Sequence, residues 1–543
     1  MDENISSVIG TSIVAELTAI VGRDGLVVDP SAVEADTRTS IPYRQIPDCL
    51  VYPRSTAEVQ AIVALARKHG IKVYPVSTGR NWGYGERSAS YPGGITMLLE
   101  RMKRIDVVDP VLGYALIEPG VTYRELDDHL KRHAPSLWCD CAGSTASASV
   151  LGNALDKGRG LTPYADHFGA LCGMEVVLAD GSLVRTGNLT DTPNRVWNLY
   201  KWGVGPYLDG LFVQSNLGIV VKAGIWLMPA PGAFDLVVFE WTANSDRLPA
   251  MIDRLRGLVF DGTLRARPHV ANDFAMLCIA SQFPWHLSDG KHRLSDEALA
   301  AWRREHGVSP WTFGCGLYGT PREVRRQRRA LRRALRPYGR LWSFGVVARN
   351  DWIGRMAFSI ARFGARLMGK SPAFLESIAP AANLFRGIPT DDFVKQVYFK
   401  SHAQKPSGDV DPPRDGCGFI WIGPVVPFTG SDVERCLELA RGLYAAHDFD
   451  VFVEILIESP RALIVLFGVF YRRDDAVEAA RASAWYTAFR SVMIESGYPP
   501  YRETAQSAPA VFDGNPAVAT LLADIKAALD PQKTIAPGRY GIR

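Results

Sequence analysis

The chain has 543 residues, which is enough for two or three domains, and its hydrophobic (47%) and charged (22%) fractions are those of an ordinary globular protein. A formal net charge of +4 is small for this length, so the composition argues against a nucleic-acid-binding protein. The N-terminal stretch MDENISSVIG has no basic-then-apolar leader, and no apolar run reaches about 18 residues. We therefore expect a cytoplasmic protein that contacts neither membrane nor nucleic acid.

The first predicted unit is a compact α/β arrangement over residues 50–110. The segments CLVYPRS, IKVYPVS and GITMLLE predict strands, and TAEVQAIVALARKHG predicts an amphipathic helix with Thr56 as its N-cap and Gly70 at its end.

The second of these strands leads into the glycine-rich loop STGRNWGYG. Its glycines allow a tight turn or a close approach of backbone N–H groups to a phosphate. The loop has neither the Gly-Lys-Ser/Thr of a P-loop nor the Rossmann spacing. A surface turn is therefore the competing interpretation.

A second α/β unit is predicted up to about residue 229. Its helix, TYRELDDHLKRH, is followed by another loop of small residues, CAGSTASASVLGN. The stretch GALCGMEVVLADGSLVRTG then predicts a hairpin, because Asp-Gly separates two apolar runs. Two units that each carry a loop of small residues suit an extended cofactor lying between them.

Beyond residue 230 the pattern changes to longer strands that alternate with helices. The strands FDLVVFEW, GFIWIGPVVP, FDVFVEILIE and ALIVLFGVFY predict a large antiparallel sheet backed by helices. The arginine-rich segment Pro321–Pro337 predicts a helix. Its leucines recur at helical spacing and it lacks aromatic residues, which favours a solvated helix face over a nucleic-acid site.

The eight cysteines are scattered along the chain, and only Cys139 and Cys141 are close together. Since no second pair has the spacing of zinc ligands, we expect no metal site and interpret the cysteines as buried free thiols.

Five segments, in this order and at consistent spacing, resemble the vanillyl-alcohol oxidase / p-cresol methylhydroxylase (PCMH) family of flavoenzymes. They cover nearly the whole chain, and long motifs in series are far more specific than one glycine loop. The segments are STGRNWGYG (77–85), IEPGVTYREL (117–126), GNALDKGRGLTPYADHFGALCGMEVVLADGSLVRTG (152–187), GVGPYLDGLFVQSNLGIVVKAGIWLMP (203–229) and LDPQKTIAPGRYG (529–541).

The resemblance implies an α+β fold. It places a PCMH-type FAD-binding domain at 1–229, made of two subdomains over about 50–110 and 111–229. It also implies a large antiparallel-sheet substrate (cap) domain at 230–499 and a C-terminal segment, 500–543, that returns to the FAD-binding domain. The protein is then expected to be a homodimer or a higher homo-oligomer.

The implied cofactor is FAD. In this family the two loops of small residues surround the pyrophosphate with backbone N–H donors, which is what a diphosphate requires. The family often links FAD to a histidine or tyrosine, but Phe419 stands at that position here, so we expect non-covalent FAD. The residues implied to bind FAD are Pro75, Ser77, Thr78, Gly79, Arg80, Asn81, Trp82, Gly83, Pro119, Gly143, Ser144, Ser149, Gly152, Asn153, Tyr164, Gly218, Ile219, Val220 and Arg539.

The resemblance also places Tyr84, Tyr501 and Arg502 around a phenol oxygen. A free phenol ionises near pH 10, and an adjacent guanidinium with two hydroxyl donors favours the phenolate. The electron-rich ring then releases a hydride from the para benzylic carbon to FAD, which leaves a quinone methide. The implied reaction is the oxidation of 4-substituted phenols, such as 4-hydroxybenzyl alcohols, 4-alkylphenols or 4-allylphenols, with O2 as electron acceptor.

The chain departs from the family pattern at several positions. Ser144 stands near where family oxidases have an aspartate, and Asp140 is a weaker candidate for that role. Glu454 lies in an otherwise apolar strand, where a charged residue is costly unless it is used or paired. We expect it to be a catalytic base, or to form a salt bridge with a nearby arginine. Leu161 replaces a common tyrosine.

We place three residues in the substrate pocket: Leu161, Phe419 and Trp421. His167 is expected to be structural. Three alternatives stay open: a dehydrogenase that passes electrons to a cytochrome or another acceptor, a sugar, lactone or hydroxy-acid flavoenzyme of the same fold, and a flavin-binding subunit without catalysis.

Overall fold

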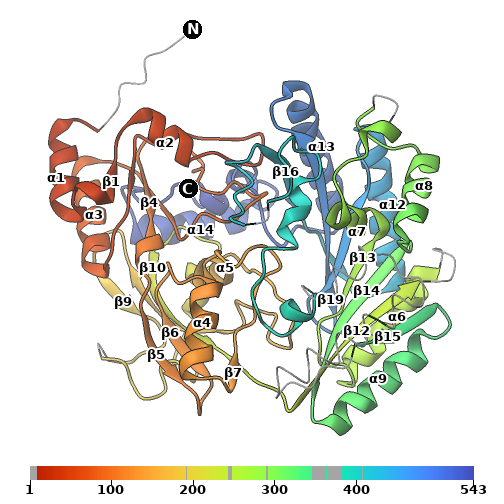
Figure 1. The fold of residues 1–543 in the computed structure, drawn as a ribbon. Coiled ribbons are helices and arrows are strands. Elements are labelled where there is room, and N and C mark those ends of the chain that lie inside the picture. Colours follow the sequence, from red (N-terminus) through yellow and green to blue (C-terminus); the bar gives the residue numbers. More distant parts are fainter. Residues whose placement is uncertain are drawn as a thin grey trace.

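The computed structural model describes residues 9–190, 192–241, 247–288, 291–344, 363, 381–406 and 408–543. Its main elements are three large β-sheets, besides a two-stranded one, and the helices that cover them, which confirms the predicted α+β class (Figure 1). The four-stranded and five-stranded sheets are built from residues 26–226, and the largest sheet, built from residues 233–472, lies beside them.

The first sheet has the strand order β1-β2-β4-β3, with β2, β4 and β3 parallel. Its strands are β1 (Leu26–Val27), β2 (Cys49–Val51), β3 (Val73–Val76) and β4 (Ile95–Leu98). Helices α1 (Thr11–Val21) and α3 (Thr56–His69) pack on it through a shared hydrophobic cluster. Helix α3 ends at Gly70 as predicted, but its N-cap is Ser55 rather than Thr56, because the Glu58 N–H donates to the Ser55 hydroxyl.

The second sheet is antiparallel throughout and has the order β5-β6-β10-β8-β9. Its strands are β5 (Ile105–Asp109), β6 (Tyr114–Ile117), β8 (Leu171–Val177), β9 (Leu183–Arg185) and β10 (Ile219–Trp226). The predicted hairpin is confirmed, since β8 pairs with β9 across the Asp180-Gly181 turn. Helices α4 (Tyr123–His133) and α5 (Val150–Leu155) precede β8 and flank the second loop of small residues.

The largest sheet is an antiparallel sheet of eight strands beyond residue 230, as predicted. Its strands are β12 (Ala233–Trp241), β13 (His269–Asn272), β14 (Trp311–Gly319), β15 (Gly339–Ser343), β16 (Cys417–Ile422), β17 (Val425–Pro427), β18 (Phe452–Ile457) and β19 (Ala462–Arg472). Four helices cover one face of this sheet, and each contacts the next in the spatial order α9 (Pro321–Leu335), α6 (Leu248–Phe260), α12 (Gly430–Ala446) and α13 (Ala476–Glu495).

Side chains along β18 alternate between the hydrophobic core and a cavity on the other face of the sheet. Val453, Ile455 and Ile457 belong to the core under the helices, whereas Glu454 and Leu456 face a cavity on the other side. Successive side chains of a strand point to opposite faces, so one strand contributes to both.

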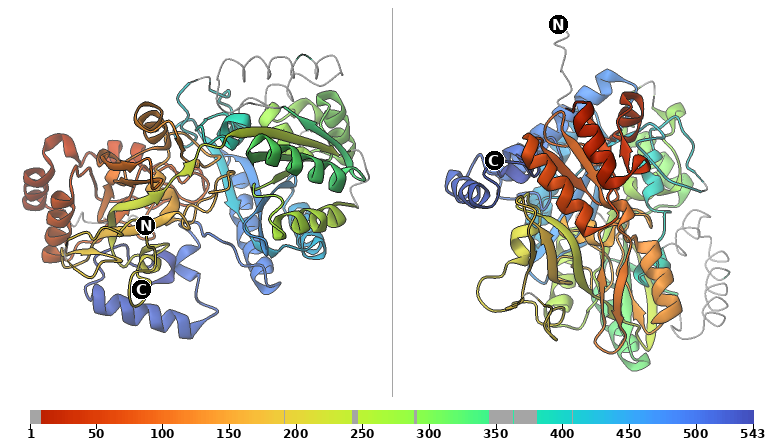
Figure 2. Two further views of the ribbon diagram at one scale, coloured as in Figure 1. Left: turned by 90° about the horizontal axis from the view of Figure 1, so that it is seen from below. Right: turned by 90° about the vertical axis from the view of Figure 1, so that its left-hand side faces the viewer.

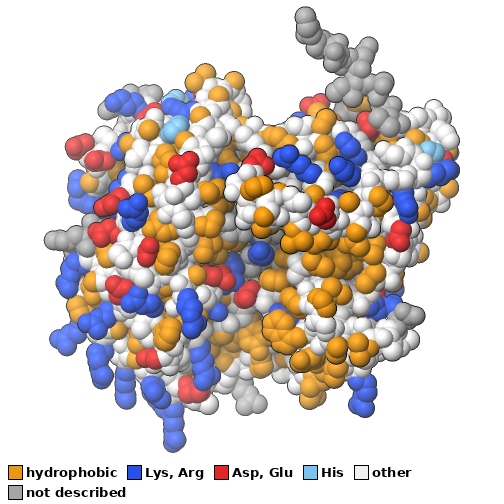
Figure 3. Space-filling view, turned by 180° about the vertical axis from the view of Figure 1, so that it is seen from behind, with side chains coloured by type: hydrophobic (Ala, Val, Ile, Leu, Met, Phe, Trp, Pro, Cys, Tyr) orange, Lys and Arg blue, Asp and Glu red, His pale blue; other side chains and the backbone are white. Residues whose placement is uncertain are grey.

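The arginine-rich helix α9 buries Val324, Leu331 and Leu335 against the sheet and turns most of its arginines outward. Figure 3 shows basic side chains gathered at the edge of the molecule where α9 lies. This arrangement agrees with the predicted solvated helix face.

The C-terminal segment lies against the two N-terminal sheets. After α14 (Pro516–Leu529), the Val73 N–H donates to the Thr534 carbonyl (2.8 Å), and the Ala536 N–H donates to the Val73 carbonyl (2.8 Å). Lys526 is fully buried and donates to Asp530 and to two backbone carbonyls, which fixes the tail. Figure 2 shows α14 beside the N-terminal half of the chain.

All eight cysteines are buried and free, as predicted. None of the described helices combines the length and the apolar composition that crossing a membrane requires.

Candidate active site

A cavity of about 350 Å³ lies where the two N-terminal units, the large sheet and the C-terminal segment meet. It brings together most of the residues that the sequence predicts for the site. Those that line it are Pro75, Ser77, Thr78, Gly79, Arg80, Asn81, Trp82, Tyr84, Gly143, Ser144, Ser149, Gly152, Asn153, Gly218, Ile219, Val220, Phe419, Trp421, Glu454, Tyr501, Arg502 and Arg539.

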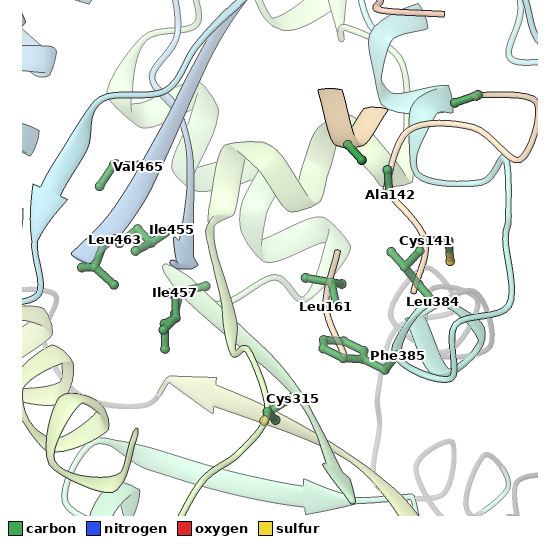
Figure 4. Close-up of a cluster of buried hydrophobic side chains, with 14 of the residues drawn as sticks. Cys141, Ala142, Leu161, Cys315, Leu384, Phe385, Ile455, Ile457, Leu463 and Val465 are labelled. Atoms are coloured by element: carbon green, nitrogen blue, oxygen red, sulfur yellow. The ribbon is translucent and has the colours of Figure 1, made fainter. Parts of the chain in front are cut away.

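Four predicted site residues do not line this cavity. The Pro119 carbonyl accepts a hydrogen bond from the Ser149 hydroxyl (2.6 Å), so Pro119 supports the loop from behind. Leu161 and Tyr164 pack in the hydrophobic core, and Figure 4 shows Leu161 beside Phe385. The leucine that replaces the common tyrosine therefore contributes to packing between the second unit and the large sheet.

Gly83 is the fourth of these residues, and it is required by packing. Its φ is 80°, and an added Cβ would lie 2.2 Å from Trp421 Cδ1. A side chain at this position would therefore push the large sheet away from the first glycine loop.

The two loops of small residues are joined directly. The Ser149 N–H donates to the Thr78 hydroxyl (3.0 Å), and a Cβ added at Gly152 would lie 2.6 Å from the Ser77 hydroxyl. Glycine at position 152 thus permits a close approach that any side chain would prevent, and the cavity passes along this contact.

The guanidinium of Arg502 is the central charged group of the cavity. Its Cζ lies 4.9 Å from the ring centre of Tyr84 and 5.2 Å from that of Tyr501, while the two tyrosine hydroxyls are 3.5 Å apart. Arg502 is 7% exposed, and its buried Nη2 has no hydrogen-bond partner among the described residues. The structure thus brings the three predicted residues together around an unsatisfied cationic donor.

Electrostatics keep Tyr84 neutral and Arg502 charged. Burial raises the pKa of Tyr84 well above 10, nearby Tyr501 raises it further, and Arg502 opposes the shift. Burial acts against the charge of Arg502, but Tyr501 and Asp156 more than offset it and raise its pKa. A neutral phenol group and a charged guanidinium are both hydrogen-bond donors, so this end of the cavity suits an anionic oxygen.

Asp156 is a cavity residue that the sequence did not indicate. Its carboxylate accepts from the Tyr540 hydroxyl (2.5 Å) and from Asn81 Nδ2 (3.1 Å), and it pairs with Arg502 Nε (3.2 Å). Asp156 lies directly after α5, within the motif that begins at Gly152, and this position in the sequence could have marked it as a candidate site residue.

The wall formed by the large sheet is mostly apolar. Strands β16, β18 and β19 contribute Phe419, Trp421, Leu456, Ile464 and Leu466, and Glu454 is the charged residue among them.

Glu454 Oε2 lies 3.3 Å from His269 Nε2 on the neighbouring strand β13. The expected arginine partner is thus replaced by a histidine. Ala271 is the direct cross-strand neighbour of Glu454, and His269 is two residues along the same face, within diagonal reach. Sequence reasoning missed His269 because strand register is not visible in a single segment.

Another carboxyl group, Glu86, directly follows the first glycine loop and also lines the cavity. Its Oε1 accepts from the Ser40 hydroxyl and from the Gly83 N–H, while the buried Oε2 has no hydrogen-bond partner in the described part of the chain. Burial raises the pKa of Glu86 to about 7, although these hydrogen bonds lower it. The residue also has a φ of 50°, a conformation that is uncommon for a non-glycine residue.

Asp140 and His167 form a buried structural pair. His167 Nε2 lies 2.8 Å from the Asp140 carboxylate, which also accepts from the Thr162 N–H (3.0 Å). The Tyr123 hydroxyl lies 3.1 Å from His167 Nδ1. These contacts use Asp140 fully and agree with the structural role expected for His167, whereas Ser144 lines the cavity.

The residues present fit FAD. Polar side chains and glycines of both loops line one part of the cavity. A diphosphate needs many donors and little side-chain bulk, and these loops supply both. No histidine or cysteine is among the described residues that line the cavity, so a covalent link through either would need a residue from elsewhere.

Comparisons with known proteins give the same assignment. The FAD binding domain family matches residues 47–187. The 1'-carboxy-chondrochloren decarboxylase of Chondromyces crocatus is 34% identical, and the match covers 97% of both chains. The 4-cresol dehydrogenase (hydroxylating) flavoprotein subunit of Pseudomonas putida is 27% identical over 97% of this chain and 95% of its own. The solved structure of 4-ethylphenol oxidase from Gulosibacter chungangensis, an isoeugenol complex, has a TM-score of 0.85 at 26% identity, covering 100% of this chain and 99% of that one.

Proposed function

Because the chain belongs to the vanillyl-alcohol oxidase / p-cresol methylhydroxylase family of FAD-dependent oxidoreductases, we propose that it oxidises 4-substituted phenols. One observation carries this proposal: the buried Arg502 guanidinium lies against the rings of Tyr84 and Tyr501, and its Nη2 has no hydrogen-bond partner among the described residues. A phenolate oxygen would accept from Arg502 and from the two hydroxyls. The substrates in view are 4-hydroxybenzyl alcohols, 4-alkylphenols and 4-allylphenols.

The chemistry divides between cofactor and protein. Bound FAD supplies the acceptor, N5, for the hydride that leaves the benzylic carbon. The protein's part is to hold the phenol as its anion, because negative charge on the ring oxygen pushes electrons toward the para position and favours the quinone methide. Arg502 provides the stabilising charge, and Tyr84, kept neutral by burial, provides a hydroxyl donor.

Glu454 is proposed as the base on the opposite wall. It is the charged residue on an otherwise apolar sheet face, where it can accept the proton of a water molecule that adds to the quinone methide or a proton lost from the para chain. His269, 3.3 Å away, would hold the carboxylate in place.

Anaerobic mixing of the holoenzyme with a panel of para-substituted phenols tests the proposal. We expect the visible absorbance of the flavin to bleach with 4-ethylphenol or 4-hydroxybenzyl alcohol and to stay unchanged with aldonolactones or D-lactate. Bleaching by the lactones or by D-lactate alone would move the protein to the sugar or hydroxy-acid class.

The electron acceptor is proposed to be O2. Among the described residues, a Cβ added at Gly143 would meet only Leu384 Cδ2, at 3.5 Å, which leaves space beside Ser144. Among the relatives one is named an oxidase and another a dehydrogenase flavoprotein subunit, so a redox partner is the alternative. Stoichiometric hydrogen peroxide during turnover supports O2; its absence, with turnover rescued by a cytochrome, supports the partner.

We propose that FAD is bound without a covalent link, because the buried Phe419 offers no nucleophile. Acid precipitation should leave the yellow colour in the supernatant. A homodimer is proposed for the assembly, to be checked by the mass of the protein in solution.

A second candidate function is oxidative decarboxylation, which the relative at 34% identity favours by its name. If a carboxylate sits on the carbon next to the benzylic carbon, loss of CO2 from the quinone methide sends the C–C electron pair into a new C=C bond and restores the phenolate. The substrate 3-(4-hydroxyphenyl)propanoate would then give 4-vinylphenol and one CO2 for each two electrons transferred. Measuring CO2 with this substrate separates the two reactions.

A further inference from the structure

Three residues form a closed set of contacts around the inner end of the cavity: Asp156, Asn81 and Arg502. Arg502 Nε donates to the Asp156 backbone carbonyl (2.9 Å) and pairs with its carboxylate (3.2 Å). Arg502 Nη1 donates to Asn81 Oδ1 (3.2 Å), and Asn81 Nδ2 donates back to the Asp156 carboxylate (3.1 Å). Both groups of the Asn81 amide are thus engaged within the protein.

These contacts leave Nη2 as the nitrogen of Arg502 without a partner among the described residues. The Cζ of the guanidinium lies over the rings of Tyr84 (4.9 Å) and Tyr501 (5.2 Å), so packing as well as hydrogen bonding limits its movement. An arginine side chain otherwise has large rotamer freedom, and fixing it in advance lowers the cost of binding an anion.

We propose that Asp156, together with Asn81, is the positioning residue that directs Nη2 of Arg502 to the substrate oxygen. The role rests on the proposed binding of a phenolate and deepens it. It also gives Asn81 a task other than contact with the cofactor phosphates. Asp156 itself is held by the Tyr540 hydroxyl at its other oxygen, so the arrangement connects α5, the first glycine loop and the C-terminal segment.

The test compares two ligands that the enzyme cannot oxidise by this route. 4-Chlorophenol has no benzylic hydrogen and can bind as an anion, whereas 4-chloroaniline has the same shape and stays neutral at pH 8. Their dissociation constants are measured with the oxidised holoenzyme from the perturbation of the flavin spectrum. We expect Asp156→Ala to weaken 4-chlorophenol about tenfold and to leave 4-chloroaniline within about twofold.

Rescue by the conservative variant is the second readout. Asp156→Asn keeps a side-chain acceptor for its neighbours and should bind 4-chlorophenol within about threefold of the wild type. Asp209→Ala removes an equally buried carboxylate outside the cavity and serves as the control, with both ligands unchanged. If Asp156→Ala cannot be purified with flavin, Asn81→Ala replaces it, with a loss of about threefold to tenfold for the phenol alone.

The outcomes separate the two levels of the proposal. A wild-type enzyme that binds both ligands equally would overturn the proposed phenolate site itself. A wild type that prefers the phenol, with variants that keep this preference or lose both ligands equally, would overturn only the positioning role.

Discussion

The two walls of the cavity differ in polarity and in the sign of the charge that they carry. On the side of the N-terminal units and the C-terminal segment, Arg502, Asp156, Tyr84 and Tyr501 form a dense polar network around one cationic donor. The wall from the large sheet is apolar and carries a carboxylate, Glu454, with a single histidine beside it. A ligand with one anionic end and one apolar end is oriented by such a contrast. Under the proposed function, the cationic end would bind the ring oxygen and the sheet would contact the para substituent.

Removing Arg502 should have the largest effect, because it abolishes the charge on which the contrast depends. We expect Arg502→Ala to lower the rate of anaerobic flavin reduction by 4-ethylphenol about 1,000-fold, the scale at which loss of a preorganised charge-stabilising donor is felt. Arg502→Lys keeps the charge without the planar fork and should recover part of the rate.

Arg414→Ala, in an exposed ion-pair cluster away from the cavity, is the control and should reduce at the wild-type rate. Equal rates of flavin reduction for the wild type and Arg502→Ala would show that the charge of Arg502 does not contribute to the reaction.

The polar wall also carries a buried carboxyl group, Glu86, whose effect can be measured through protein stability. Glu86 is buried with one oxygen unpartnered, and its pKa is raised to about 7. The folded state therefore holds its proton where the unfolded state, with a pKa near 4.5, has lost it. The sign follows: the free energy of unfolding should fall as the pH rises from about 4.5 to about 7, by up to about 3 kcal/mol, and stay low above that.

Glu86→Gln should remove this fall and make the protein more stable than the wild type at pH 8. Urea denaturation at several pH values measures it, with the exposed Glu34→Gln as a variant that keeps the wild-type slope. A wild-type stability that does not decline across this range would show that Glu86 is stabilised as a carboxylate.

Glu454 allows the role of the apolar wall to be tested separately. If it is the base, Glu454→Gln should slow turnover about 100-fold, within the usual range for a general base, while flavin content stays the same. Phenol binding at the far wall should change little, so the loss should fall on kcat rather than on KM.

The exposed Glu438→Gln on α12 is the matched control. A Glu454→Gln enzyme with wild-type kcat would leave the carboxylate as a structural partner of His269.

Features that depend on interactions between neighbouring residues could be predicted from the sequence, whereas features that depend on contacts between distant residues could not. The alternation in FDVFVEILIE predicts a strand with Glu454 on one face, and local turn chemistry predicts the Asp180-Gly181 hairpin. Tyr84, Tyr501 and Arg502 were found through motif resemblance, since nothing local indicates that residues more than 400 positions apart meet.

Asp156 and His269 escaped because their roles depend on tertiary placement. Asp156 gains its meaning from Arg502, Asn81 and Tyr540, which reach it from distant segments. His269 reaches Glu454 only through the register of β13 on β18. Leu161, which was expected in the substrate pocket, lies in the hydrophobic core and is not among the residues that line the cavity.

The two tyrosine hydroxyls give the smallest and most specific effect. They lie 3.5 Å apart, close enough to share one oxygen of a ligand, and each places a hydroxyl beside the charge of Arg502. A hydrogen bond to a charged group contributes about 1.5–3 kcal/mol, so Tyr84→Phe and Tyr501→Phe should each slow flavin reduction about tenfold or somewhat more. In the proposed site both donors act on the same oxygen, so their effects should not add, and a double-mutant cycle should show a coupling of at least about 0.5 kcal/mol. Strict additivity would mean that the hydroxyls serve different groups, and the phenolate would then be held by Arg502 and a single tyrosine.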